Sequence, residues 1–295
     1  MRHRLSPQAG MLLVVLFWGG NFTAAKIGFT ELEPAAFTAL RFVIASVVLW
    51  AVLRWSEGPA PLPPGVLWRL VWLGVLGNTA YQLLFMEGLQ RTSATKTSLI
   101  LAGMPALVTL AAGMLGVERV TTGQRVAVLV ATVGVVVVIL GRGGSIDNGF
   151  GAGELMLLGA IVVWAAFTLL QQHWAPPISP LSLTAWTVYT GTPGLVLAGI
   201  PALARTEWRH VTIAGWGGVA YSALLSLVAA YVLWNRGLAR LGAARTVVYN
   251  TMVPLVATVI AMVALHERPG VIHLVGGALI LCGVILTRHA VAAEG

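Results

Sequence analysis

The sequence has few charged residues. Asp, Glu, Lys and Arg together make up 9% of its 295 residues, whereas a soluble protein carries about 25%. So few charges cannot cover a water-facing surface of this size, and 58% of the residues are hydrophobic. The composition excludes an ordinary soluble domain and indicates a protein whose solvent is mainly the lipid bilayer.

Cysteine is nearly absent. Cys282 is the single one, so an intramolecular disulfide is excluded and a thiolate metal site is not expected. His266, Glu267 and His273 do not have the spacing of a zinc-binding helix, and Pro269 interrupts them. We predict no metal and no cofactor. Because the hydrophobic segments also lack paired carboxylates and a G-x-S-x-G motif, we predict that the protein is not an enzyme.

Acidic residues are missing from the middle of every hydrophobic segment, since all ten lie in loops or near segment ends. A proton-coupled carrier usually keeps a carboxylate inside the membrane, so any coupling would use another group, such as Glu87 or a histidine. The net charge is +8, but the basic residues stand singly between hydrophobic segments. This pattern indicates anchors at the membrane surface and argues against nucleic-acid binding.

Charges, prolines and glycines divide the chain into ten hydrophobic segments, each about long enough to span a bilayer as a helix. We therefore predict an all-α membrane protein with ten transmembrane helices. They are expected at residues 9–29, 34–54, 66–88, 94–116, 121–141, 152–172, 178–200, 212–236, 241–265 and 269–289.

The sequence contains an internal duplication. Trp18 and Trp164 are 146 residues apart, as are Pro34 and Pro180, and a longer run of matches is 149 residues apart. Such rare residues in constant register indicate two repeats, which we place at 1–147 and 148–295. Because each repeat has five helices, the second enters the membrane in inverted orientation, as in secondary transporters. The longer run includes Gly88/Gly237, Lys96/Arg245, Thr97/Thr246, Pro105/Pro254, Thr109/Thr258, Glu118/Glu267 and Arg119/Arg268.

Basic residues in the loops predict the orientation. With the N-terminus inside, ten Lys and Arg residues fall on the cytoplasmic side and seven, Lys26 and Lys96 among them, on the outer side. We therefore expect both termini in the cytoplasm.

Each repeat ends its fourth helix with the same pair, Glu118-Arg119 and Glu267-Arg268. A carboxylate at a helix C-terminus opposes the helix dipole, but the free N–H groups at the start of the next helix would bind it. A tight corner between consecutive helices is the favoured interpretation. A gate latch that acts alternately on the two sides is the other.

Pro105 and Pro254 lie thirteen residues before these glutamates, well inside the bilayer. A proline there removes one backbone hydrogen bond and frees the carbonyl four residues earlier. Matched kinks in two inverted repeats are typical of a transport site, although membrane helices also tolerate kinks that serve packing alone. The sequence leaves both interpretations of these prolines open, a hinge for transport and a kink for packing.

Polar and aromatic residues inside the hydrophobic segments form the candidate substrate site. Buried amides and hydroxyls need a cavity or a neighbouring helix to hydrogen-bond, so we expect these residues to line a central cavity. Hydrogen bonding between helices is the alternative for any one of them. Together they suit a zwitterion with an apolar side chain. The candidates are Trp18, Asn21, Asn78, Tyr81, Gln82, Met86, Trp164, Thr168, Tyr231, Trp234, Asn235, Tyr249 and Asn250.

Small residues recur on the fifth helix of each repeat. Ala127 and Gly134 are matched by Gly276 and Gly283, and the spacing of seven puts each pair on one helix face. This face would pack the two repeats together or would form a homodimer; without a dimer we expect a monomer.

The ten-helix duplication, the mid-helix prolines and the Glu-Arg endings resemble the drug/metabolite transporter superfamily, in its ten-helix branch with two EamA-like repeats. The resemblance covers roughly residues 11–140 and 152–289. It implies a carrier of the bacterial inner membrane with a central cavity between the repeats. Given the Trp and Tyr candidates, exporters of aromatic amino acids and of dicationic drugs such as paraquat are the most similar group. One departure is the first helix, LFWGGNFTAAK, which lacks the membrane-embedded glutamate of small multidrug antiporters.

We therefore expect an alternating-access carrier that exports amino acids, including aromatic and neutral ones, with the lipid bilayer as its other partner. A multidrug or other small-metabolite exporter is the alternative within transport. A cationic drug would need a buried carboxylate, and a nucleotide sugar several basic residues in the cavity, for which only Lys26 and Arg41 are candidates. A membrane-embedded enzyme is the alternative of another class, and the missing acid–base clusters count against it.

Overall fold

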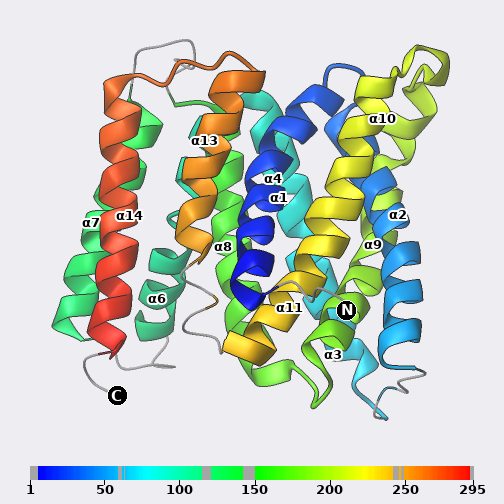
Figure 1. Cartoon of the computed structure of the whole chain (residues 1–295), viewed down its shortest axis with the longest axis horizontal. Helices are drawn as coiled ribbons and strands as arrows, with labels where there is room; N and C mark the ends of the chain where they lie inside the picture. Colours follow the sequence, from blue (N-terminus) through cyan, green and yellow to red (C-terminus); the bar gives the residue numbers. More distant parts are fainter. Residues whose placement is uncertain are drawn as a thin grey trace.

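The computed structural model is a bundle of helices that cross it from one end to the other (Figure 1). It describes residues 6–58, 62, 64–114, 121–141, 150–241, 246 and 249–292. Within these ranges, seven helices are long and apolar enough to cross a membrane, and two shorter apolar helices cover Tyr249–Ala264 and Val271–Leu286. The all-α fold predicted for a bilayer is confirmed.

Each repeat supplies five membrane-crossing segments, some of them made of several helical pieces. In the first repeat they are α1 (Pro7–Gly28), α2 (Pro34–Ser56), α3 (Leu67–Gly74) with η1 (Val75–Ala80) and α4 (Tyr81–Arg91), α5 (Ala94–Leu101) with α6 (Met104–Met114), and α7 (Thr122–Leu140). In the second they are α8 (Ala152–Trp174), α9 (Pro180–Arg205), α10 (Ile213–Ala220) with η3 (Tyr221–Ala229) and α11 (Ala230–Leu241), η4 (Tyr249–Met252) with α13 (Val253–Ala264), and α14 (Val271–Ala292). A short 3₁₀ turn, η2 (Trp208–His210), precedes α10. The predicted segments agree within a few residues, except that parts of the fourth and the ninth lie outside the described residues.

The contacts at one end of the bundle show that the repeats are inverted. Polar contacts join the loop after α1 to the start of α10, the last turn of α1 to the end of α4, and the start of α5 to the start of α8. The first helix of repeat one therefore ends at the same side of the bundle at which the first helix of repeat two begins. We call this side, at the top of Figure 1, the α1–α2 end.

The third helix of each repeat contains a π-helical stretch that the sequence did not predict. Val75–Ala80 (η1) lies 149 residues before the second part of Tyr221–Ala229 (η3). Because a π turn is wider than an α turn, it leaves backbone groups available to neighbours. The Nε1 of Trp18 on α1 donates to the carbonyl oxygen of Ser226 at 3.1 Å. The π stretches thus help to hold the third helix of a repeat against other helices.

Both candidate prolines lie at the second position of a new α-helix. Pro105 follows Met104, the first residue of α6, after a break at Ala102 and Gly103, and Pro254 occupies the same place in α13. Proline is tolerated there because the first turn of a helix does not need its N–H as an intrahelical donor. The kinked or broken helices predicted at these prolines are thus broken ones, and each proline starts the second piece. Their role as hinges stays a prediction.

The small-residue faces of α7 and α14 pack against each other within one chain. A Cβ placed on Gly134 would lie 2.7 Å from the carbonyl oxygen of Gly276 and from the backbone nitrogen of Ile280. A Cβ on Gly283 would lie 2.5 Å from the backbone nitrogen of Ala131. Packing of the two repeats accounts for these glycines, and the homodimer stays a prediction.

Gly134→Ala should lower the melting temperature of the purified protein in detergent. The added methyl group meets backbone atoms that cannot turn aside, and such overpacking destabilises by about 1–3 kcal/mol. The matched control is Gly217→Ala on α10, where a Cβ meets nothing within 4 Å. We expect the control to melt at or slightly above the temperature of the parent protein. Equal melting temperatures for the two variants would contradict the close contact of α7 and α14.

Candidate functional site

Two aromatic clusters each join equivalent helices of the two repeats. Trp18 of α1 packs against Tyr231 and Trp234 of α11, with ring centroids 6.3 and 5.1 Å apart. Trp164 of α8 packs against Tyr81 of α4, with centroids 4.8 Å apart. Because Trp18 and Trp164 are counterparts, each cluster joins the first helix of one repeat to the third helix of the other. The structure thus brings five of the candidate residues into two related groups.

Arg41 of α2 is buried close to residues of both clusters. Its side chain is only 1% exposed, and its Nη2 donates to Oε1 of Gln82 at 2.5 Å. The guanidinium lies 5.3 Å from the ring centroid of Phe42, which belongs to the same hydrophobic cluster as Tyr231, and Gln82 follows Tyr81 in the chain. Arg41 was predicted only as a residue that would enter a cavity, and its buried position next to Gln82 makes it part of the candidate site.

The charge of Arg41 is incompletely compensated. Its Nε has no hydrogen-bond partner, and no ion pair joins it to a carboxylate in the described part of the chain. Burial of an unpaired cation costs several kcal/mol, and a cation–π contact offsets only about 2 kcal/mol of this. We call the region around Arg41, Gln82 and the two clusters the polar and aromatic centre. It therefore carries a positive charge, and the Nε donor of Arg41 has no acceptor there.

Several candidates have their polar groups bonded inside the protein. Oδ1 of Asn21 accepts from the hydroxyl of Ser222 at 2.5 Å. The hydroxyl of Thr168 and the amide of Asn235 each donate to a carbonyl one turn earlier in their own helices. Asn21 therefore shows the hydrogen bonding between helices that was the alternative predicted from the sequence, whereas Thr168 and Asn235 bond within their own helices.

The remaining candidates differ in their burial. Asn78 and Met86 are buried, and Asn78 packs close to Gly191 of α9. Tyr249 packs with the residues around Trp18, whereas Asn250 is exposed. Asn78 and Met86 thus pack among other side chains, whereas Asn250 lies at the surface.

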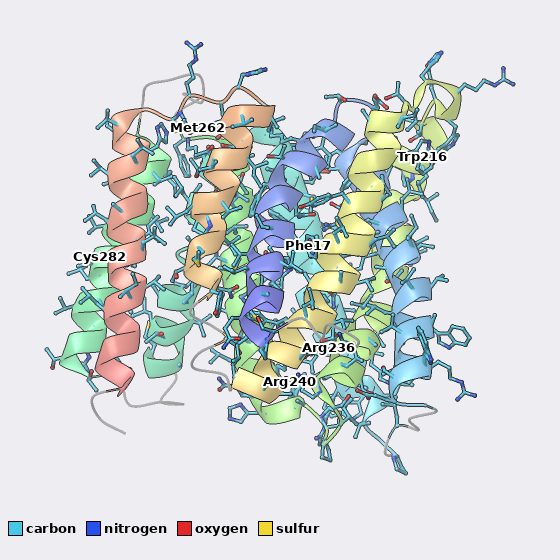
Figure 2. All side chains as sticks on the ribbon, in the orientation of Figure 1. Phe17, Trp216, Arg236, Arg240, Met262 and Cys282 are labelled. Carbon is cyan, nitrogen blue, oxygen red and sulfur yellow. The ribbon has the colours of Figure 1, made fainter. Side chains whose placement is uncertain are left out.

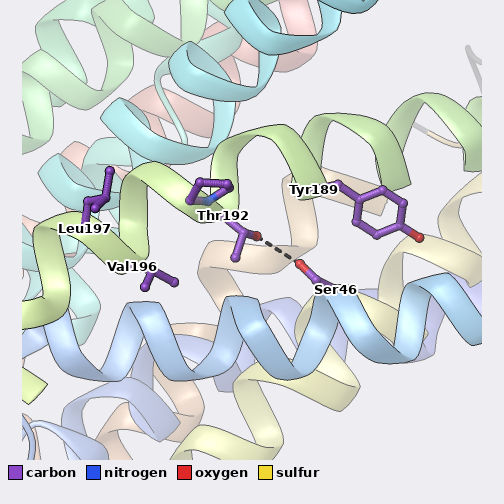
Figure 3. Close-up of a pocket in the computed structure, with 6 residues that line it drawn as sticks. Ser46, Tyr189, Thr192, Val196 and Leu197 are labelled. Atoms are coloured by element: carbon purple, nitrogen blue, oxygen red, sulfur yellow. Dashed lines mark hydrogen bonds between the residues drawn. The ribbon is translucent and has the colours of Figure 1, made fainter.

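A groove of about 460 Å³ lies elsewhere, between α2 and α9 (Figure 3). Ser46 and Thr192 form a hydrogen bond across it, 2.9 Å between hydroxyl oxygens. Leu197 at its edge is 68% exposed, so the groove opens onto the hydrophobic surface that the bilayer covers. None of the candidate residues lines it. The lining residues are Ser46, Tyr189, Thr192, Pro193, Val196 and Leu197.

Glu267 caps a helix of the other repeat. Its two carboxylate oxygens accept from the backbone nitrogens of Ala94 and Thr95, at 2.7 and 2.9 Å, at the start of α5. We predicted that this glutamate would bind the next helix in its own repeat, and this was wrong. Free N–H groups attract it as expected, but they belong to α5. Its counterpart Glu118 lies outside the described residues.

Lys96, one turn into the membrane-crossing helix, is fully buried. Its Nζ lies 2.8 Å from Oε1 of Glu154, which is itself 2% exposed at the start of α8. The other oxygen of Glu154 accepts from the backbone nitrogen of Gly151. The prediction that Lys96 lies in a surface loop was wrong, because a paired lysine can be buried where a single one cannot. The ion pair joins the two repeats.

The outer turns of the same end are also held by carboxylates. Glu31 accepts hydrogen bonds from the backbone and hydroxyl of Thr212, and these hydrogen bonds hold its pKa below the ordinary value. The guanidinium of Arg205 binds Glu33 with two nitrogens and lowers the pKa of that carboxyl. At neutral pH both carboxyls are ionised, so several charged contacts join the repeats at the α1–α2 end.

Glu154→Gln should destabilise the protein by about 3–5 kcal/mol, because it removes the carboxylate that compensates a buried ammonium group. Thermal unfolding in detergent measures the loss. Glu87→Gln is the control, since the Glu87–Arg91 pair is partly exposed and such pairs contribute about 0–1 kcal/mol. The double variant Lys96→Met/Glu154→Met should recover most of the loss. A melting temperature equal to that of the control would contradict a stabilising role of the buried pair.

An inverted pair of five-helix repeats around a buried polar and aromatic centre defines a class of protein, the secondary membrane carriers. The EamA-like transporter family matches residues 7–140 and 151–288, once in each repeat. The chain belongs to this family, and it is a membrane transporter.

Relatives of similar length agree with this assignment. The uncharacterized transporter YyaM of Bacillus subtilis is 28% identical over 92% of this chain and 89% of its own length. A probable terminal-alkyne amino-acid exporter of Streptantibioticus cattleyicolor is 29% identical over 95% of this chain and 92% of its own. A solved crystal structure, 20% identical, covers 96% of each chain with a TM-score of 0.66, which supports the fold alone.

Proposed function

We propose that this chain is an alternating-access carrier that exports amino acids, including aromatic and neutral ones, across the bacterial inner membrane. The observation that carries the proposal is the pair of aromatic clusters with the hydrogen-bonded Arg41 and Gln82 buried close to them. Aromatic rings suit an apolar side chain, and a buried cation suits a carboxylate. The amino-acid exporter of Streptantibioticus cattleyicolor supports the same substrate class.

The contacts of Glu267 and of the Lys96–Glu154 pair support a closed gate at the α1–α2 end. Basic residues favour the opposite end as the cytoplasmic one: Figure 2 shows Arg236 and Arg240 at the lower end of α11, away from the α1–α2 end. Following the positive-inside rule, we assign the closed gate to the outer side and both termini to the cytoplasm. The gate latch, the less favoured interpretation of Glu267 from the sequence, thereby becomes the proposed one.

A dicationic-drug carrier is the second candidate, and the charge at the centre argues against it. Arg41 would repel a cation, and the described residues form no ion pair between Arg41 and a carboxylate that would reverse the sign. A buried carboxylate would be needed to bind such a drug. The aromatic clusters alone favour this candidate, through cation–π contacts.

Uptake into proteoliposomes tests the proposal. Labelled phenylalanine and threonine would be offered with and without an imposed pH gradient. Saturable uptake that is inhibited by unlabelled substrate supports an amino-acid carrier. If the substrate accumulates only when the pH gradient is imposed, transport is also coupled to protons. Uptake no greater than into empty liposomes, together with uptake of a labelled dication, would favour the drug carrier.

Trp164→Ala should reduce phenylalanine transport about tenfold or more without preventing membrane insertion. The substitution removes a ring from the cluster with Tyr81, and an aromatic pair of this kind contributes about 1 kcal/mol beyond its buried area. Trp55→Ala is the matched control, because Trp55 is 94% exposed at the end of α2, and its transport should equal that of the parent protein. A well-folded Trp164→Ala protein with unchanged transport would contradict this placement of the site.

A further inference from the structure

Arg41 breaks the symmetry of the two repeats. At the separation of 146 residues that relates Trp18 to Trp164 and Pro34 to Pro180, the counterpart of Arg41 is Thr187. The hydroxyl of Thr187 is already bonded, since it donates to carbonyl oxygens of its own helix, α9. The aromatic clusters are thus present twice, whereas this cation is present once.

The hydrogen bonds of Arg41 leave room for a stronger acceptor. Nη2 donates to the neutral amide of Gln82, and Nε donates to nothing although it is buried. A guanidinium binds a carboxylate with two parallel hydrogen bonds, which are about twice as strong as bonds to a neutral acceptor. The oxygen of Gln82 therefore occupies one of the places that the two oxygens of a carboxylate would take.

We propose that Arg41 binds the carboxylate of the transported molecule. The carrier then requires one free carboxylate on its substrate, with an apolar group that contacts the rings of the matched clusters, and does not require the amino group. The carboxylate replaces the amide of Gln82 on the guanidinium when the centre opens. This inference rests on the proposed function, because it specifies which part of an amino acid is recognised.

Binding to the purified, full-length protein tests the inference without transport. The probes are 3-phenylpropanoate, which has a carboxylate and no amino group, and phenylalaninamide, which has an amino group and no carboxylate. Thermal unfolding in detergent is measured over a range of concentrations of each probe. We expect 3-phenylpropanoate to raise the melting temperature and phenylalaninamide to leave it unchanged. The inference is overturned if phenylalaninamide raises the melting temperature more than 3-phenylpropanoate does, or if 3-phenylpropanoate does not raise it.

Two substitutions connect the effect to Arg41. In Arg41→Gln the affinity for 3-phenylpropanoate should fall about tenfold or more, the loss expected for a hydrogen-bonded charged group. Arg41→Lys keeps the charge and should retain part of the affinity for 3-phenylpropanoate. The control is Arg54→Gln, an exposed arginine on the same helix, which should bind as the parent protein does. If Arg41→Gln does not fold, the lysine variant and the two probes on the unaltered protein still decide the matter.

The outcomes separate this inference from the proposed function. If 3-phenylpropanoate inhibits phenylalanine uptake and phenylalaninamide does not, both the inference and the proposed function are supported. Arg41-dependent binding of 3-phenylpropanoate without phenylalanine uptake supports the carboxylate site and contradicts the amino-acid carrier. If phenylalaninamide inhibits phenylalanine uptake as strongly as unlabelled phenylalanine, the amino-acid carrier is supported and the role of Arg41 is overturned.

Discussion

In a bilayer, a charge that leaves water must be compensated by the protein itself, and this constraint governs the structure. The ammonium of Lys96 is compensated by Glu154, and the carboxylate of Glu267 by the free N–H groups that begin α5. Both contacts join one repeat to the other, so they stabilise the packing of the repeats at the α1–α2 end and not the single repeats. Arg41 is the buried charge that the described residues compensate least. Its burial next to Gln82 is the basis of the proposed substrate site.

The inverted duplication gives most contacts a counterpart, and the exceptions indicate function. Aromatic clusters, π stretches and proline-started helices all occur in both repeats. A carrier needs this equivalence because two related arrangements of the same elements open the site to opposite sides. A substrate has no such symmetry, so the groups that recognise it are expected to differ between the repeats. Arg41 in the first repeat and Thr187 at the equivalent position of the second are such a difference.

The sequence predicts the fold well because its signals are local. Hydrophobic length, loop prolines and matched residues determined the helix boundaries and the inversion to within a few residues. The contacts of the site were harder to predict, since they join residues far apart. Glu267 was assigned to its neighbouring helix because the sequence shows only neighbours, and Lys96 was assigned to a loop because its partner is 58 residues away. The π stretches have no recognised residue pattern, and whether polar residues line a cavity or hydrogen-bond between helices depends on the packing of the whole bundle.

Access to the centre from the α1–α2 end is the most direct test of the account. Met86 is fully buried on α4, one turn beyond Gln82 towards that end. A Met86→Cys protein with Cys282→Ser would be treated, in membranes, with a membrane-impermeant maleimide from that side. With Glu267 intact we expect little labelling, and with Glu267→Gln a labelling rate several-fold higher, whereas Glu207→Gln at the same end should change nothing. Equal labelling rates with and without the Glu267 carboxylate would contradict a gate held closed by contacts between the repeats.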